Sequence, residues 1–540
     1  MTTIDTHAGA APAGSVAGSG GAAASLIAVA DWLTTTDHKK IGRLFIALAA
    51  VSSLIAIALA ALLGFERINA DSFQIFANDN IGQFFSFFRV ELVFGAVVPM
   101  LVGVAIAVVP LQVGARSIAF ARGASFGLWT WLAGIVMTEI SYLGNGGPGG
   151  GNQTMVDLFL LGMLLMIIGL VFASASIAVT VLNSRAPGMS MERAPVFAWG
   201  ALVGTSALVF TLPALAGNLI YAFVDHRHGR VAFGGNAGIM DWIGWAFGQP
   251  QTYVFVLLAF AVLAEIMAVV AGARHMLRGV VLAGVGIAAT AVLGGVIQQQ
   301  QTMMWTGSTG DKFRDLAPWF IFNVLPIIGA LAVLGASMFL LISRSPRMIP
   351  PFAPAMLGVG SVLVGMIGHA LSTISRTNLA PTVFEEAEFV FVMYGGILAV
   401  MAAVAFWGPK LWGRSLPGNA VMGTSVVAFL GTFLAGLPYF VAGFADQPGV
   451  TANGFAYEGP QDLWNIISTA GHALVLLAVL AFVATAVTGF RQGERPGDDP
   501  WNGVTLEWAT SSPPPADNFA DVPVVKSAEP LLDLKSGGAA

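Results

Sequence analysis

Side chains of the types that bind metals are scarce in this chain. It has no cysteine and seven histidines among 540 residues, so a metal site would need imidazole, thioether or carboxylate ligands. Only His369 and His472 lie within long apolar stretches. The others fall in predicted loops or tails: His7, His38, His226, His228 and His275. Because two histidines on different predicted helices do not define a site by their spacing, we expect both to be hydrogen-bonded or to face a cavity.

Ionisable side chains within apolar stretches are the second candidate for chemistry. A charge at the centre of a membrane costs roughly 2.5–3.5 kcal/mol on insertion scales, so each one needs a partner or a purpose. The candidate polar network consists of Arg89, Glu91, Gln251, Tyr253, Glu265, Gln300 and Glu385, beside Glu386 and Glu388. It has three interpretations. It fills a cavity by mutual hydrogen bonding, which we favour, or it lines a path for protons or ions, or it holds a hard cation such as Mg, Ca or Mn.

These side chains are predicted to lie on membrane-spanning helices. The chain is 56% hydrophobic and only 10% charged, where soluble domains carry about 25% charged residues. Apolar runs of about 20 residues, enough to cross a ~30 Å hydrocarbon core, recur about twelve times. The sequence therefore predicts an all-α integral membrane bundle. The net charge of −5 gives no basic footprint, so no nucleic-acid partner is expected.

One membrane domain with two tails is predicted. Residues 1–31 are rich in Ala, Gly, Ser and Thr, and residues 491–540 are polar and proline-rich, so both are predicted to be disordered. Residues 32–490 form the membrane domain. Lys and Arg recur in the loops on the same side as the N-terminus, as at Lys39, Arg122 and Arg274. The positive-inside rule therefore predicts that both termini are cytoplasmic.

Motifs spread along the membrane domain resemble those of one known family. Residues 36–43 read Thr-Asp-His-Lys-Lys-Ile-Gly-Arg, residues 183–191 read Asn-Ser-Arg-Ala-Pro-Gly-Met-Ser-Met, and residues 212–217 read Leu-Pro-Ala-Leu-Ala-Gly. Residues 247–253 read Phe-Gly-Gln-Pro-Gln-Thr-Tyr, where the family has Phe-Gly-His-Pro-Glu-Val-Tyr. Over residues 32–490 the chain thus resembles subunit I of cytochrome c oxidase, of the haem-copper oxidase superfamily. The resemblance implies a twelve-transmembrane-helix bundle with cytoplasmic ends.

The resemblance also implies where the family's haem and copper ligands would fall. Those ligands are histidines, and the corresponding positions here hold Phe88, Gln249, Gln301, Thr302, Glu386 and Glu388. Gln251 stands at a proton-transfer glutamate of the family. Tyr253 matches its tyrosine, but the copper-ligating histidine to which that tyrosine is cross-linked is replaced by Gln249. Because haem iron needs an axial side chain such as His, Met, Cys or Tyr, we expect no haem, no copper and no catalytic residue.

The leading hypothesis is a divergent subunit I relative that has lost oxygen reduction. Such a pseudoenzyme would serve as a non-catalytic scaffold or assembly subunit of a respiratory-type complex. Its expected partners are membrane lipid and oxidase-type subunits II and III, in a bacterial inner (plasma) membrane. One alternative is a proton or ion conduit that uses Glu91, Glu265, Glu386 and Glu388. Another is an oxidoreductase, a terminal oxidase subunit that binds haem through ligands not used by the family.

Overall fold

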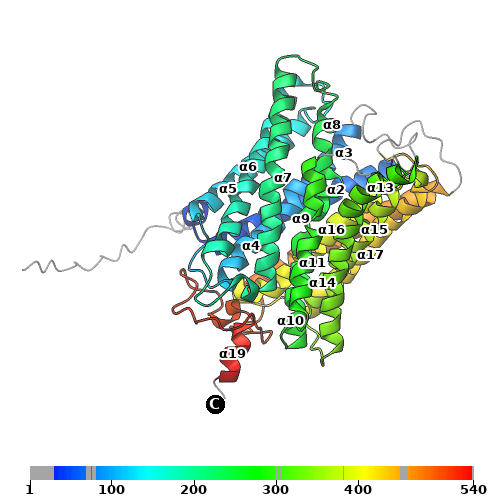
Figure 1. The fold of residues 1–540 in the computed structure, drawn as a ribbon. Coiled ribbons are helices and arrows are strands. Elements are labelled where there is room, and N and C mark those ends of the chain that lie inside the picture. Colours follow the sequence, from blue (N-terminus) through cyan, green and yellow to red (C-terminus); the bar gives the residue numbers. More distant parts are fainter. Residues whose placement is uncertain are drawn as a thin grey trace, which may run out of the picture.

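The protein is a bundle of helices. The computed structural model describes residues 29–68, 75, 81–297, 302–304, 306–380, 382–449 and 460–537. Within these ranges the only β-pairings are two isolated bridges, Met303 with Ile374 and Thr382 with Pro448. The all-α class is therefore confirmed (Figure 1). Most of the predicted N-terminal tail lies outside the described residues.

Long helices make up the membrane domain, and π-helical turns join two pairs of them. The α-helices are α2 (His38–Glu66), α3 (Ile81–Val90), α4 (Val98–Gln112), α5 (Ala121–Leu143), α6 (Gln153–Asn183), α7 (Val196–Arg227), α8 (Ile239–Ile243), α9 (Gln251–Phe255), α10 (Leu257–Ala271), α11 (Arg278–Ala288), α12 (Ala291–Ile297), α13 (Thr309–Trp319), α14 (Leu325–Ile342), α15 (Phe352–Ser372), α16 (Phe384–Trp412), α17 (Gly418–Gly443), α18 (Gln461–Gln492) and α19 (Pro530–Gly537). The π-helical turn Glu91–Val97 joins α3 to α4, and Phe320–Val324 joins α13 to α14.

Counted by helix length, the structure has fewer membrane spans in its described residues than the sequence predicts. In the described ranges, nine continuous helical segments are long and apolar enough to cross a membrane. Two shorter apolar segments, Leu257–Ala271 and Arg278–Gly294, follow one another between α9 and α13. In addition, α5 has 23 residues and packs along α6. The twelve-span arrangement stays a prediction.

Two helical segments form the centre of the bundle. The most apolar windows of Ile81–Gln112 and Phe384–Trp412 are completely buried, whereas the other spans leave part of their surface uncovered. Small residues bring helices close together. A Cβ atom added to Gly42 on α2 would lie 2.4 Å from the carbonyl oxygen of Gly103 on α4. Such close backbone approach is the usual means of helix association in lipid, where hydrophobic burial drives little.

The C-terminal segment, residues 493–537, packs against one end of the bundle, at the bottom of Figure 1. Leu506 and Trp508 are buried in it. At the end of α16, Lys410 Nζ donates to the carbonyl oxygens of Asp498 at 2.9 Å and Thr510 at 2.6 Å. This arrangement differs from the predicted disordered tail, because side chains scattered along a polar segment find partners on the helix ends. We call this end of the bundle the C-terminal face.

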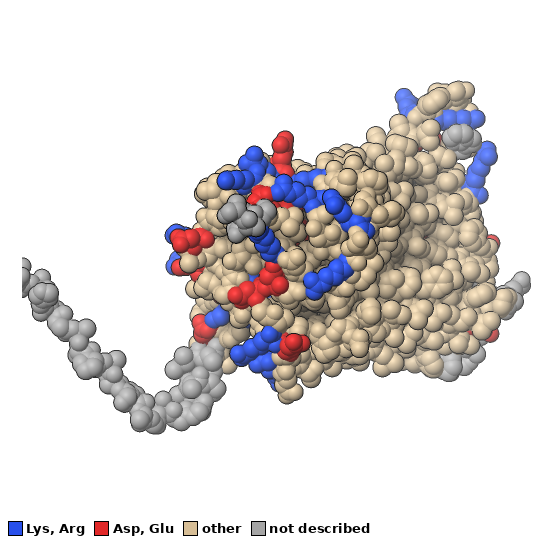
Figure 2. All heavy atoms as spheres, turned by 90° about the horizontal axis from the view of Figure 1, so that it is seen from below, with Lys and Arg blue, Asp and Glu red and all other residues tan. Residues whose placement is uncertain are grey.

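Charged side chains concentrate on the C-terminal face. Figure 2 shows this face, with Lys, Arg, Asp and Glu gathered on it and a flank of the bundle that is almost entirely uncharged. Ion pairs tie the C-terminal segment to the bundle here. Arg278 lies 3.7 Å from Glu529, and Arg274 pairs with Asp533. A charged end and an uncharged flank are the distribution expected of a protein that crosses a bilayer.

Candidate functional site

An ion pair joins α3 to α16 deep in the bundle. Arg89 Nη2 lies 3.0 Å from Glu386 Oε2, and Arg89 Nη1 lies 3.4 Å from Glu385 Oε1. The guanidinium also stacks between the rings of Phe85 and Phe389, each 4.8 Å away. The side chain of Glu386 is 5% exposed and that of Glu385 is 43% exposed. The buried pair is therefore Arg89 with Glu386, and Glu385 sits at its outer edge.

A second carboxylate on α16 is bonded to a histidine. Glu388 is fully buried, and its Oε2 lies 2.9 Å from Nδ1 of His369 on α15. The imidazole meets the ring of Tyr253 edge to face, with centroids 6.2 Å apart. Glu388 Oε1 and the Tyr253 hydroxyl are buried without a protein partner. Three helices thus bring an acid, an imidazole and a phenol together. Their unpaired polar atoms are suited to hydrogen-bond a small molecule such as water.

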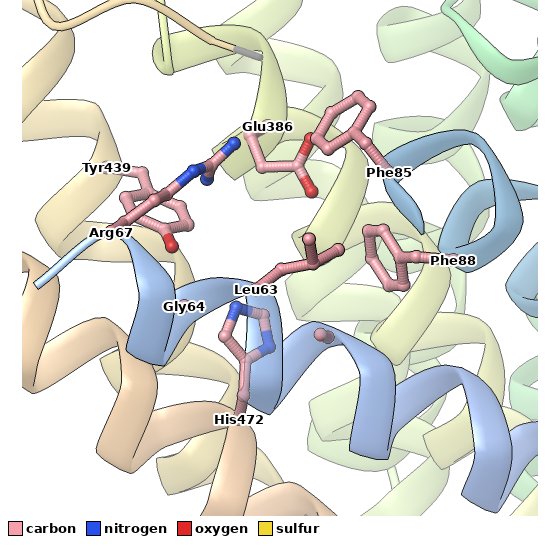
Figure 3. A pocket seen from close by; sticks show the side chains of 9 residues that line it. Leu63, Gly64, Arg67, Phe85, Phe88, Glu386, Tyr439 and His472 are labelled. Carbon is pink, nitrogen blue, oxygen red and sulfur yellow. The ribbon is translucent and has the colours of Figure 1, made fainter. Parts of the chain in front are cut away.

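A small hollow lies beside the ion pair. Its volume is about 10 Å³, and its walls come from α2, α3, α16, α17 and α18. In Figure 3 the side chains of Phe88, Glu386, Tyr439 and His472 point toward one another around it. His472 is held by its Nδ1, 2.8 Å from the hydroxyl of Tyr394. Arg67 also lines the hollow and lies over the Tyr439 ring, with its guanidinium carbon 5.3 Å from the centroid.

The other members of the predicted polar network lie in separate places. Gln251 Nε2 donates to Thr211 Oγ1 at 3.1 Å, while both polar atoms of Gln249 and both carboxylate oxygens of Glu91 are buried without a partner. Thr302 is partly exposed in the segment between α12 and α13. Gln300 and Gln301 lie outside the described residues. The structure therefore brings together Arg89, Glu385 and Glu386, and separately Glu388 and Tyr253.

Glu265 is on the opposite side of the bundle, near the C-terminal face. Its Oε2 accepts from the Phe197 backbone N–H and its Oε1 from Thr505 Oγ1, each at 3.1 Å. Glu507 of the C-terminal segment is completely buried next to it and accepts from Gln112 Nε2 at 3.0 Å and Trp407 Nε1 at 3.2 Å. Burial raises the pKa of the Glu507 carboxyl, and the nearby Glu265 carboxyl interacts with it. These two acids form a second buried cluster.

Comparison with known proteins identifies the fold and the family. Residues 40–474 match the family described as cytochrome c and quinol oxidase polypeptide I. The chain belongs to this family. Cytochrome c oxidase subunit 1 of Bacillus subtilis is 29% identical over 544 residues, covering 94% of this chain and 83% of that protein. A putative cytochrome c oxidase subunit 1-beta of Streptomyces coelicolor is 30% identical over 541 residues, covering 94% and 91%.

A solved structure supports the same fold. A heme-copper terminal oxidase dimer, determined by cryo-EM, superposes with a TM-score of 0.68 and 15% sequence identity, covering 85% of this chain and 84% of that chain. At this identity the likeness shows the fold alone. The predicted resemblance to the haem-copper oxidase superfamily is confirmed, and the chain is an integral membrane protein with bacterial relatives.

The expectation that no cofactor is involved is wrong at the level of the family. The chain belongs to a family of cytochrome c and quinol oxidases, and its structural neighbour is a heme-copper oxidase. The prediction treated the missing histidines as if they decided the cofactor content, which family membership contradicts.

The side chains predicted to stand at the family's ligand positions nevertheless do not have the chemistry of histidine ligands. Phe88 has no donor atom, and Glu386 and Glu388 are engaged with Arg89 and His369. Across the described residues, no three His, Cys, Asp or Glu side chains gather in a way that could hold a metal ion. We therefore derive no reaction step through haem or copper at these positions.

Three residues escaped the sequence-based site. His369 and His472 were recognised as lying within spans, but nothing in their spacing pointed to Glu388 or Tyr394 as partners. Glu507 was assigned to a tail because its surroundings are polar and proline-rich. The one local signal was the run Val-Thr-Leu-Glu-Trp at 504–508, which places large apolar side chains on both sides of the acid.

Proposed function

We propose that this chain is a non-catalytic subunit of a respiratory-type oxidase complex in a bacterial plasma membrane. It supplies the subunit I scaffold, and oxygen reduction takes place elsewhere in the complex. The family match and the length of chain shared with bacterial cytochrome c oxidase subunits support the role of a subunit I scaffold. The partners are oxidase-type subunits II and III, which associate with subunit I-like proteins, together with membrane lipid.

The observation that carries the proposal is that the side chains predicted at the ligand positions contact other protein side chains. Glu386 pairs with Arg89 at 3.0 Å, Glu388 bonds to His369 at 2.9 Å, and Phe88 packs against Phe389 with ring centroids 5.7 Å apart. These contacts join α3, α15 and α16 and so stabilise the centre of the bundle.

The assembly role is tested by removing the chain from its own host. Without it, the amounts of subunit II-type and subunit III-type proteins in the membrane should fall, as measured by quantitative mass spectrometry. Reintroduced wild-type chain and a Glu388→Gln variant should both restore them, because a scaffold needs the fold and a neutral amide fills the same space. Unchanged partner amounts in the absence of the chain would contradict the proposal.

A proton or ion conduit is the second candidate function. Its supporting observation is that both carboxylate oxygens of Glu91 and Oε1 of Glu388 are buried without a hydrogen-bond partner in the protein. Such acids take up and release protons in membrane relays. Dye-loaded proteoliposomes would report proton flux under an imposed pH gradient. If the protein is a conduit, the wild-type protein conducts protons and Glu386→Gln/Glu388→Gln does not. Equal flux in the wild-type protein and the double variant argues against a conduit.

A further inference from the structure

A large apolar groove opens on the side of the bundle between α2, α16 and α18. Its volume is about 580 Å³, within the roughly 300–1,000 Å³ typical of sites for small ligands. Aliphatic and aromatic side chains such as Ala50, Val400 and Val483 form its walls. Ala47 and Val487, at its rim, are exposed. In a membrane protein such a rim faces the acyl chains of the bilayer, so the groove is accessible to lipid.

One end of the groove is basic and aromatic. Arg43, at the start of α2, and Arg491, at the end of α18, both line it, together with Trp32 and Trp412. The Arg43 guanidinium carbon lies 5.5 Å from the Trp412 ring centroid and 5.8 Å from that of Trp32. Trp412 in turn stacks on Phe490, with ring centroids 4.1 Å apart. Tryptophan and arginine together are typical of the level of the lipid headgroups.

The two arginines carry charge that the protein does not neutralise by direct pairing. Of the acids that precede Arg43, Asp37 pairs with Lys39 at 2.9 Å and acts on Arg43 only at longer range, and Asp31 pairs with Lys40 at 2.5 Å. Within the described ranges, no carboxylate lies within 4.0 Å of the Arg43 or Arg491 guanidinium. Guanidinium groups prefer bidentate contact with phosphate or carboxylate oxygens. The end of the groove thus has the chemistry of an anion site, and its body has the chemistry of an acyl-chain site.

We propose that the groove is a specific site for an anionic phospholipid. The acyl chains lie along the apolar walls, and the phosphate and its anionic headgroup lie beside Arg43 and Arg491, flanked by Trp32 and Trp412. Basic pockets between membrane helices are a recurring means of binding acidic headgroups. The site is independent of oxygen reduction and of the proposed assembly role, because its residues are not shared with the cluster around Glu386 and Glu388.

Native mass spectrometry of the full-length, delipidated protein in detergent tests the site. Dioleoyl phosphatidylglycerol is titrated as the anionic probe, and dioleoyl phosphatidylcholine is its zwitterionic counterpart. The wild-type protein is expected to bind phosphatidylglycerol more tightly. Arg43→Gln/Arg491→Gln should weaken phosphatidylglycerol binding roughly 30-fold, about fivefold for each arginine. Arg43→Lys/Arg491→Lys, which keeps both charges, should retain most of the affinity.

Two controls separate the groove from general charge effects. Arg116→Gln/Arg122→Gln removes the same charge from two exposed positions outside the groove and should leave binding unchanged. Ala50→Leu narrows the apolar wall and should weaken both lipids alike. The proposal is overturned if both lipids bind equally to the wild-type protein, if the surface double variant loses as much affinity as the groove double variant, or if the groove retains an apolar molecule without phosphate that phosphatidylglycerol does not displace.

Discussion

Among single residues, Arg89 joins a buried carboxylate to two aromatic rings. It neutralises Glu386 in the interior and fills the space between two phenyl rings, so both its charge and its planar shape are used. Removing one member of a buried ion pair leaves the other charge uncompensated. The same reasoning does not extend to Glu385, which is 43% exposed and can be solvated.

Arg89→Gln should therefore destabilise the protein by about 3–5 kcal/mol, because Glu386 is left buried without its partner. Thermal unfolding in detergent, followed by tryptophan fluorescence, measures the change. Arg89→Gln/Glu386→Gln should cost less than Arg89→Gln alone, since no charge remains. Arg227→Gln breaks a comparable pair with Asp157, but the Arg227 side chain is 64% exposed and the loss should be small. Equal losses for Arg89→Gln and Arg227→Gln would contradict the buried ion pair.

Asn518 fixes the C-terminal segment to the bundle. It is completely buried, its Oδ1 accepts from Lys39 Nζ at 2.9 Å, and its Nδ2 donates to the Ala115 carbonyl oxygen at 2.8 Å. Asn518→Ala removes a hydrogen-bond partner from Lys39 and from Ala115. It should make docking of the C-terminal segment less favourable by about 1–3 kcal/mol in free energy. Faster hydrogen exchange across residues 504–520 is the expected readout. The matched control is Asp517→Ala, which changes an exposed neighbour and should leave exchange as it is; unchanged exchange in Asn518→Ala would refute the anchor.

At the scale of elements, the C-terminal segment is the part that departs most from expectation. Its composition is that of a disordered tail, yet it contributes Glu507 and Trp508 to the buried end of the bundle. Composition averages over a segment, whereas docking depends on a few side chains that meet specific helix ends. Helix periodicity and motif spacing, by contrast, were enough to predict the all-α membrane fold and the family.

For the buried carboxylates of α16, the sequence predicted the residues but not their partners. Glu386 and Glu388 were singled out by their position in an apolar stretch, and that reasoning holds for any acid in a span. Their partners, Arg89 and His369, could not be assigned, because 297 and 19 residues separate the members of the two pairs and only helix packing brings them together.

The docking of the C-terminal segment should depend on pH through Glu507. Burial raises the pKa of this carboxyl, so the docked state holds a proton that the detached segment releases. Between the ordinary carboxyl pKa of 4.5 and the raised value, docking therefore weakens as pH rises and is strongest on the acid side. Proteolysis of the segment at about pH 5 and about pH 8 should be faster at the higher pH. In Glu507→Gln, with Glu265 still in place, the rate of proteolysis should depend less on pH. A pH dependence equal to that of the wild-type protein would show that another group causes it.

For the whole molecule, the charged C-terminal face and the uncharged flank (Figure 2) predict an orientation in the membrane. The positive-inside rule predicts that the C-terminal face lies in the cytoplasm, together with the chain's Lys- and Arg-rich loops. The absence of cysteine makes the prediction simple to test with single substitutions. Exposed positions are available on both ends, Ser511 on the C-terminal face and Ala232 in the loop after α7.

A membrane-impermeant maleimide should label Ala232→Cys in intact spheroplasts and Ser511→Cys only after lysis. Wild-type protein, which has no thiol, is the background control. The reverse pattern would place the C-terminal face outside the cell and contradict the assigned orientation, while leaving the helical fold unaffected.

The central claim is that this family member supports a complex without reducing oxygen itself. The most direct measurement is oxygen consumption by the detergent-purified chain, supplied with reduced cytochrome c or with a quinol, while haem and copper are quantified in the same sample. Oxygen consumption is expected at the background of a protein-free control, whatever cofactor the sample contains. Sustained turnover in the range of about 1–10³ s⁻¹ that is ordinary for enzymes would contradict it and would make this chain a catalytic subunit with an unfamiliar ligand set.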